Sequence, residues 1–227
     1  MKKTKIFDLT LFELSLWLTS CLVMIIGYLI ALENGLLNFI ASLIGVTALI
    51  FVAKGHAIGQ ALTIVFAIFY GIISFELKYY GEMITYVFMS APMALCALIA
   101  WIKHPYNESR EVEIASLSKK TLILLLLSTL IVTVLFYFVL GALGTASLIV
   151  STLSVTTSFL AAALTFFRSP FYALAYSAND IVLIILWIVA SLEDPSYIVM
   201  VACFMMFLFN DLYGFFNWQR MKKRQAA

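Results

Sequence analysis

The chain has 227 residues, of which 64% are hydrophobic and only 11% are charged, and its formal net charge is +2. A soluble domain of this length needs a far larger charged fraction to coat its surface, so the composition excludes that class. It predicts an all-α polytopic membrane protein. The three cysteines fall in apolar stretches and the two histidines lie beside lysines, so we expect neither a disulfide framework nor a metal site.

The N-terminal region, residues 1–34, is expected to hold a short amphipathic segment and an extra transmembrane helix. The segment covers residues 5–13 and is predicted to lie at the membrane interface. The apolar stretch from Leu14 to Leu32 is longer than the apolar region of a signal peptide and lacks a small-x-small cleavage site. We therefore predict a retained helix and not a cleaved leader.

Long apolar stretches follow one another along the whole chain. A helix that crosses a bilayer needs about 20 predominantly apolar residues. The sequence read with that window predicts eight spans, which are separated by short polar breaks and one longer charged connection over residues 103–120. The spans are roughly 14–32, 35–53, 57–75, 83–102, 121–140, 145–167, 171–191 and 196–218.

The basic residues are distributed unevenly over the predicted loops. With eight spans and an internal N-terminus, only Lys78 of the 14 lysines and arginines falls on the outer side. The outer loops carry mainly acidic residues. This asymmetry follows the positive-inside rule and predicts a bacterial inner-membrane protein with both termini in the cytoplasm.

A weak internal repeat divides the chain. Trp101-Ile102-Lys103 closes the fourth span and Trp218-Gln219-Arg220 closes the eighth, so each Trp-x-basic tail ends a group of three spans. Two parallel three-helix units joined by a linking helix form a known transporter architecture. The alternative is that aromatic belts and the positive-inside bias place Trp before Lys at many cytoplasmic ends. The predicted regions are 1–34, 35–103 (first unit), 104–144 (loop and linking helix), 145–220 (second unit) and 221–227 (basic cytoplasmic tail).

Two Asn-Asp pairs, Asn179-Asp180 and Asn210-Asp211, lie deep inside the last two spans. A carboxylate near the middle of a membrane helix costs roughly 2.5–3.5 kcal/mol on insertion scales, so these pairs predict a polar pathway. Nearby rings can sandwich a planar base, while amides and carboxylates can hold ribose hydroxyls. The alternative is that the polar residues only bridge helices, at about 0.6 kcal/mol each. The expected substrate contacts are Asn179, Asp180, Asn210, Tyr176, Trp187 and Tyr213 from the second half and Gln60 and Tyr86 from the first.

Signatures of other function classes are missing from the sequence. It contains no His-Glu-x-x-His, Gly-x-Ser-x-Gly or Walker motif and no arginine ladder, so we expect no enzyme, cofactor, ATP-driven pump or voltage sensor. The partners that we expect are a small nucleoside-like substrate and the lipid bilayer. No nucleic acid is expected, and a homo-oligomer is left open.

The C-terminal run from Asn210 to Trp218, Asn-Asp-Leu-Tyr-Gly-Phe-Phe-Asn-Trp, is followed by basic residues. It resembles the closing signature of the Pnu vitamin transporters, approximately Asn-x-x-Tyr-Gly-x-x-Asn-Trp, and the layout of spans resembles theirs over most of the chain. The resemblance implies a SWEET-like fold and facilitated diffusion, with trapping by a separate cytoplasmic kinase. It also implies that Asn210 and Tyr213 face the central site and that Trp218 marks the cytoplasmic end. Asp211 points about 100° away from Asn210 on a helix, so we expect it to brace neighbouring helices.

The seventh span departs from the family pattern. PnuC-type carriers of nicotinamide riboside have Trp-x-x-Trp there, whereas this chain reads Tyr-Ala-Leu-Ala-Tyr-Ser-Ala-Asn-Asp from Tyr172 to Asp180. Other members are associated with thiamine, riboflavin and deoxynucleosides. Because the Asn-Asp pair offers donors and acceptors to a base edge or a sugar hydroxyl, we predict uptake of a nucleoside-like metabolite, with deoxynucleosides ahead of nicotinamide riboside. A proton-coupled carrier that cycles Asp180 and a non-transporting scaffold or signalling subunit are the alternatives.

Overall fold

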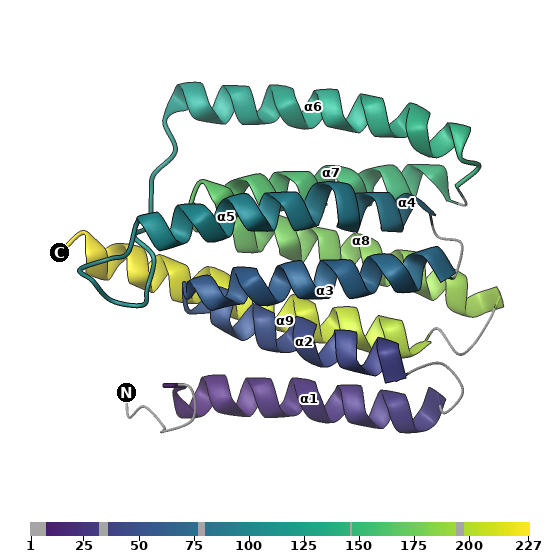
Figure 1. Ribbon diagram of the computed structural model, residues 1–227, viewed down its shortest axis with the longest axis horizontal. Coiled ribbons are helices and arrows are strands. Elements are labelled where there is room, and N and C mark those ends of the chain that lie inside the picture. Colours follow the sequence, from purple (N-terminus) through teal and green to yellow (C-terminus); the bar gives the residue numbers. More distant parts are fainter. Residues whose placement is uncertain (1–7, 32–35, 77–79, 146, 194–197) are drawn as a thin grey trace.

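A computed structural model describes residues 8–31, 36–76, 80–145, 147–193 and 198–227, and in these ranges the chain forms helices and no strand. The helices lie side by side along one common axis (Figure 1). Their bounds are α1 (Leu11–Ala31), α2 (Leu36–Ala53), α3 (Ala57–Glu76), α4 (Tyr80–Ile84), the π-helix η1 (Thr85–Ser90), α5 (Ala91–Lys103), α6 (Lys119–Ala142), α7 (Leu148–Phe166), α8 (Tyr172–Glu193) and α9 (Ile198–Gln225).

Helix length and composition match the predicted membrane class. The described residues contain seven helices that are long and apolar enough to cross a membrane. The predicted span 35–53 coincides with α2, whose apolar run Phe39–Ala53 is shorter than the other seven. The prediction of an all-helical polytopic membrane protein is confirmed.

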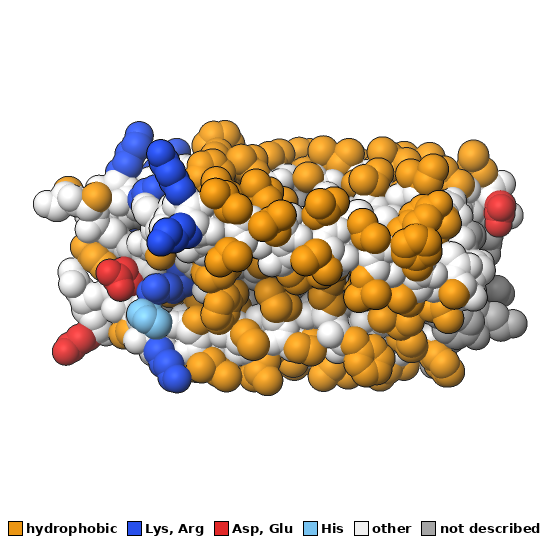
Figure 2. All heavy atoms as spheres, turned by 90° about the horizontal axis from the view of Figure 1, so that it is seen from above, with side chains coloured by type: hydrophobic (Ala, Val, Ile, Leu, Met, Phe, Trp, Pro, Cys, Tyr) orange, Lys and Arg blue, Asp and Glu red, His pale blue; other side chains and the backbone are white. Residues whose placement is uncertain are grey.

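The surface carries a broad apolar belt and one basic end. Figure 2 shows hydrophobic side chains over the middle of the molecule and Lys and Arg gathered at the end where Figure 1 places the C-terminus. On α6, large side chains such as Ile131 and Phe138 are about two-thirds exposed, at 67% and 68%. Such a surface is stable where hydrocarbon replaces water, because helices satisfy their own backbone hydrogen bonds there.

Six helical segments form the core of the bundle, and α1 and α6 lie on its outside (Figure 1). Helix α6 packs on α7, whereas α1 packs on α2 and α9. Further contacts join α2 with α3, α3 with α5, α7 with α8, and α8 with α9, and they also join α2 with α9 and α5 with α7. The π-helix η1, which continues into α5, packs on α3 and α7. The interior of the protein therefore lies between α2, α3, the continuous segment of η1 and α5, α7, α8 and α9.

The predicted span 83–102 is not one uniform helix. The widened turn η1 separates α4 from α5, and the Ala91 N–H bonds to the Tyr86 carbonyl five residues earlier. Pro92 follows directly; it has no N–H and its ring clashes with the carbonyl four residues earlier, so a wider turn before it relieves the conflict. Such turns are frequent at functional sites.

Two buried tryptophans make reciprocal contacts between the two predicted halves. Trp101 at the end of α5 donates its Nε1–H to the Thr165 carbonyl of α7, at 3.0 Å. Trp218 on α9 donates its Nε1–H to the Val52 carbonyl of α2, also at 3.0 Å. The two ring centroids are 5.3 Å apart. The third helix of each group thus bonds to the first helix of the other.

Polar contacts attach α1 to the bundle. Thr10 and Glu13 form a capping box at its start, with Thr10 N bonded to Glu13 Oε2 (2.6 Å) and Glu13 N to Thr10 Oγ1 (3.3 Å). Buried Lys54 forms an ion pair with Glu13 at 3.4 Å. Leu11 to Glu13 therefore belong to the first turn of α1, and of the predicted interfacial segment 5–13 the residues before Asp8 lie outside the described ranges.

Replacing Ser20 measures how much one of these polar contacts contributes to the stability of the protein. Its Oγ accepts a hydrogen bond from Asn210 Nδ2 at 3.0 Å and is fully buried. Ser20→Ala should lower the free energy of unfolding by about 0.6 kcal/mol, measured in mixed detergent micelles, because bonds between membrane helices average about that value. The matched control is Ser15→Ala, since Ser15 is exposed and its Oγ bonds, within the described ranges, only to the Phe12 carbonyl of its own helix. An equal loss in both variants would contradict the contribution of the α1–α9 bond.

Candidate functional site

A narrow cavity of about 70 Å³ lies at the centre of the bundle. Residues of α2, α3, η1, α7, α8 and α9 line it. Five of the eight residues expected from sequence to contact substrate are on its wall: Gln60, Tyr86, Tyr176, Asn179 and Asp180. The seventh span therefore presents both members of its Asn-Asp pair to one cavity.

Aromatic rings form one part of the wall. The Phe66 ring centroid lies 5.7 Å from that of Phe207 and 6.0 Å from that of Tyr86. Phe204 also lines the cavity, with its centroid 5.5 Å from that of Phe207. Because these rings come from α3, η1 and α9, they can enclose a flat ring from several sides.

Asn179 is oriented by hydroxyl groups on one face of α7. Its Oδ1 lies 2.8 Å from Thr157 Oγ1, 3.0 Å from Ser158 Oγ and 3.5 Å from Ser154 Oγ. Thr157 and Ser158 follow Ser154 by three and four positions, so all three hydroxyl groups lie on the same side of α7. The amide oxygen is engaged by the protein, so the NH2 group is the part of Asn179 that can bind a ligand.

Asp180 and Asp211 bring two carboxyl groups together at the cavity. Both side chains are buried, with 3% and 4% exposure, and both line the cavity. The two carboxyl groups are close enough to interact electrostatically. Asp180 Oδ2 has no hydrogen-bond partner among the described residues. The site thus combines an aromatic slot with an acidic pair that has unused bonding capacity.

The second Asn-Asp pair is oriented opposite to the expectation. Asn210 donates its Nδ2–H to Ser20 Oγ and to the Met206 carbonyl, and Tyr213 donates its hydroxyl to Glu13 Oε1 at 2.7 Å. Both residues thereby face α1, whereas Asp211, which we expected to brace helices, lines the cavity. Since adjacent residues on a helix point about 100° apart, the docking of α1 on one face of α9 leaves the face of Asp211 for the cavity.

Trp187, the remaining expected contact, lies away from the cavity wall. It is 3% exposed and belongs to an apolar cluster with Tyr70, Leu183 and Phe204. Trp187 follows Asp180 along α8, in the direction that leads away from the basic end of the molecule (Figure 1). Tyr70, whose ring centroid is 4.3 Å from that of Tyr86, occupies the same side. This cluster closes the cavity toward the end of the molecule opposite the C-terminus.

Sequence reasoning missed several residues of the cavity wall. Phe66, Phe204 and Ser158 carried no signal, because the chain has 19 phenylalanines and many serines in its apolar stretches. Asp211 did carry a signal, since it is the second mid-membrane carboxylate. The family signature points to Asn210 as the residue that faces the site, and a helix turns the adjacent Asp211 about 100° away from it.

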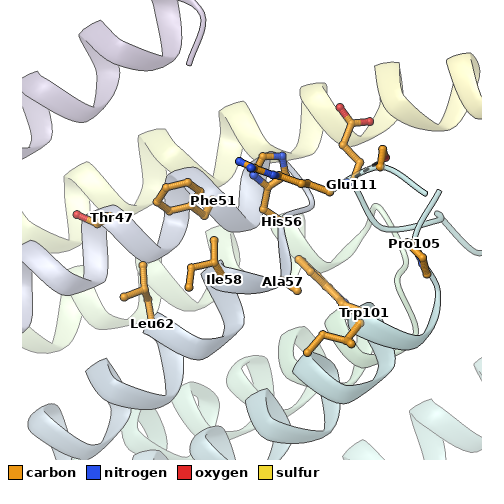
Figure 3. Close-up of a pocket in the computed structure, with 12 residues that line it drawn as sticks. Thr47, Phe51, His56, Ala57, Ile58, Leu62, Trp101, Pro105 and Glu111 are labelled. Carbon is orange, nitrogen blue, oxygen red and sulfur yellow. Dashed lines mark hydrogen bonds between the residues drawn. The ribbon is translucent and has the colours of Figure 1, made fainter. Parts of the chain in front are cut away.

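A wider pocket of about 670 Å³ opens at the basic end of the molecule. Figure 3 shows Phe51, Ile58 and Leu62 on one side and Trp101 and Pro105 on the other. Its wall is open at the surface, where Ile58 and Ile102 are 50% and 62% exposed. None of the eight expected contacts lines this pocket. The buried central cavity is therefore the candidate site.

Comparison with known proteins gives a consistent result. The sequence model described as nicotinamide mononucleotide transporter matches residues 35–220. The nicotinamide riboside transporter PnuC of Neisseria mucosa is 24% identical over 193 residues, which cover 83% of this chain and 73% of that protein. The protein of the same name from Haemophilus influenzae is 25% identical over 210 residues, which cover 92% of this chain and 90% of that protein.

A solved structure shows the same fold. A crystal structure of the vitamin B3 transporter PnuC matches with a TM-score of 0.83 at 23% sequence identity, over 96% of this chain and 94% of that chain. The resemblance of the C-terminal signature to the Pnu transporters is thus confirmed by a match that covers most of the sequence. The chain belongs to the nicotinamide mononucleotide transporter family.

Proposed function

We propose that this protein takes up nicotinamide riboside by facilitated diffusion through the central cavity. The observation that carries the proposal is a buried cavity that joins an aromatic slot to amide and carboxyl groups halfway along membrane-spanning helices. The names of two relatives that match 83% and 92% of this chain support the substrate. No coupling to ATP or an ion is part of the proposal.

The cavity wall offers a partner for each part of such a substrate. The rings of Phe66, Phe207 and Tyr86 can enclose the pyridine ring. Gln60 and the Asn179 NH2 group can bind the carboxamide or the ribose hydroxyls. Where PnuC-type carriers have tryptophans, Tyr176 lines the cavity and Tyr172 packs on Trp218 with ring centroids 4.7 Å apart.

Deoxynucleosides were the substrate class that the Asn179-Asp180 pair favoured from sequence. The relatives do not support that preference, since both are named as nicotinamide riboside transporters. The same hydrogen-bonding groups suit a riboside, which brings hydroxyls of its own. We retain trapping by a separate cytoplasmic kinase, because a phosphorylated product carries negative charges that the acidic groups of the cavity would repel.

Transport requires the cavity to open alternately toward each side. Its volume of about 70 Å³ is well below the roughly 300–1,000 Å³ of typical small-molecule sites, so a riboside fits only if helices move apart. We propose that the units 35–103 and 145–220 rock against each other, with α1 and α6 outside them. The reciprocal bonds of Trp101 and Trp218 support this division, because a twofold relation between the units predicts matched contacts.

The same proposal sets the orientation in the membrane. All eight apolar helical segments, α2 included, would cross the bilayer of a bacterial inner membrane. The basic end would face the cytoplasm together with both termini, as the positive-inside rule predicts. The rings of Trp101, Trp218 and Tyr172 would then close the cytoplasmic side of the cavity.

Tracer flux into proteoliposomes tests the function. We expect saturable entry of labelled nicotinamide riboside that is unchanged when a protonophore collapses the proton gradient. No saturable entry would contradict the transport function. Entry that stops with the protonophore would instead indicate a proton-coupled carrier.

A pair of variants on α8 tests the site. Asn179→Ala should lower the uptake efficiency at least about tenfold, equivalent to about 1.4 kcal/mol, because the bonds that its amide makes to the substrate are lost. Ser191→Ala is the matched control, since among the described residues Ser191 bonds only to the Ile188 carbonyl near the other end of the same helix. Normal uptake by Asn179→Ala would show that Asn179 only joins α7 to α8.

A further inference from the structure

The carboxyl groups of Asp180 and Asp211 define the electrostatic character of the cavity. Both side chains are buried and line the cavity, and Asp180 Oδ2 has no hydrogen-bond partner among the described residues. A carboxyl group that ionises in this position exchanges its hydration for very few contacts with the protein. The negative charge of such a carboxylate would therefore be available to a ligand in the cavity.

The protein does not supply a positive charge to balance this pair. The residues that line the cavity in the described part of the chain include no Lys, Arg or His. The titratable groups that face the pair are neutral: Tyr172 and Tyr176 on α8, Tyr86 on η1 and Cys203 on α9. Acidic Glu82 lies near Tyr86. Buried Lys54 is paired with Glu13 on the opposite side of α2 and α9.

A ligand with one positive charge would complete this site. A buried carboxylate without a cation loses its hydration and gains little in return, so it is stabilised most by a ligand that brings the opposite charge. The surrounding rings of Phe66, Tyr86 and Phe207 also favour a cation, because the faces of aromatic rings are negative. An uncharged ligand of the same shape would leave the carboxylate without a partner, and this difference creates selectivity.

We propose that the Asp180–Asp211 pair selects planar heteroaromatic cations, such as a pyridinium or thiazolium ring, over uncharged nucleosides. The proposal rests on the proposed transport function and narrows its substrate class. Nicotinamide riboside fits this class because its ring nitrogen is bonded to the ribose and carries a positive charge. The Asp211 face of α9 thereby selects the charge of the substrate, while Asn179 and Gln60 select its hydrogen-bonding groups.

The test compares ligands that differ in charge and little else. Binding to the purified full-length protein is measured by thermal shift with nicotinamide riboside, its uncharged dihydropyridine form, thiamine as a second cation, and thymidine. We expect nicotinamide riboside to bind at least tenfold more tightly than its dihydropyridine form. Asp180→Asn and Asp211→Asn should reduce this ratio toward one, because asparagine keeps the shape and removes the charge.

Glu82→Gln is the matched control. Glu82 is 6% exposed and acidic, but it does not line the cavity, so this variant should keep the wild-type ratio. If an aspartate variant does not fold, the ratio of the two affinities measured for the wild-type protein tests the proposal by itself. Equal binding of the two pyridine forms overturns the charge selectivity and leaves the transport function standing. Binding of thiamine without nicotinamide riboside supports the charge selectivity and overturns the proposed substrate, whereas binding of no ligand overturns both.

Discussion

Replacing Asp211 by alanine should lower saturable uptake by roughly tenfold to hundredfold, whereas replacing the adjacent Asn210 by alanine should leave the substrate affinity near that of the wild type. Asp211 and Asp180 are both buried on the wall of the cavity, so the substitution removes one of the two carboxyl groups from the proposed binding site. Losing a hydrogen bond to a charged group costs about 1.5–3 kcal/mol, which corresponds to that range of uptake efficiency. The measurement is the concentration dependence of tracer flux into proteoliposomes.

The adjacent residue provides the matched control within one turn of α9. Asn210→Ala removes a bond to Ser20 on α1 and should weaken the docking of α1 without changing the apparent KM. Wild-type uptake by Asp211→Ala would show that the acidic pair has no part in transport. A raised KM in Asn210→Ala with α1 still docked would return the substrate contact to Asn210, where the family signature places it.

Replacing Trp218 by alanine should lower the free energy of unfolding by about 3–5 kcal/mol. Its side chain is completely buried, its Nε1–H bonds to the Val52 carbonyl, and its ring packs against Trp101 and Tyr172. The substitution removes these contacts and leaves a cavity where the two predicted units meet. Reversible unfolding in mixed detergent micelles measures the change.

A second tryptophan is the control for this loss. Trp17 on α1 is only half-buried and donates one hydrogen bond to Thr47 Oγ1 at 3.1 Å, so Trp17→Ala should cost clearly less. Trp101→Ala should resemble Trp218→Ala, and the double variant should lose less than the two single losses combined, because the two rings share a contact. Equal losses at Trp17 and Trp218 would contradict the central position of the tryptophan pair.

The N-terminal helix gives the family signature a second role in this chain. Asn210 and Tyr213 are spaced so that they meet Ser20 and Glu13 on α1; the first bond is buried and the second is partly buried. A substitution at either residue therefore changes the attachment of α1 before it changes the cavity. Variants of the signature need a measurement of stability beside the measurement of flux.

The sequence by itself determined the helices, the basic end and one side of the candidate site. Helix positions are readable because each membrane span must be apolar over about 20 residues and must satisfy its own backbone groups. The pair Asn179-Asp180 stood out because polar groups are costly at that depth, and the structure places both on the cavity. The span predicted at 83–102 is present, but the π-helical turn within it could not be predicted, because hydropathy is the same for α-helical and π-helical turns.

The tertiary structure decided which face of each helix is used. Both faces of α9 are buried, one by α1 and the other by the cavity helices, so hydropathy could not show whether Asn210 or Asp211 faces the site. The aromatic slot is assembled from α3, η1 and α9, and no local pattern distinguishes Phe66 or Phe207 from the other phenylalanines. Depth in the membrane depends on the sequence of one helix, whereas the direction of a side chain depends on the neighbours against which that helix packs.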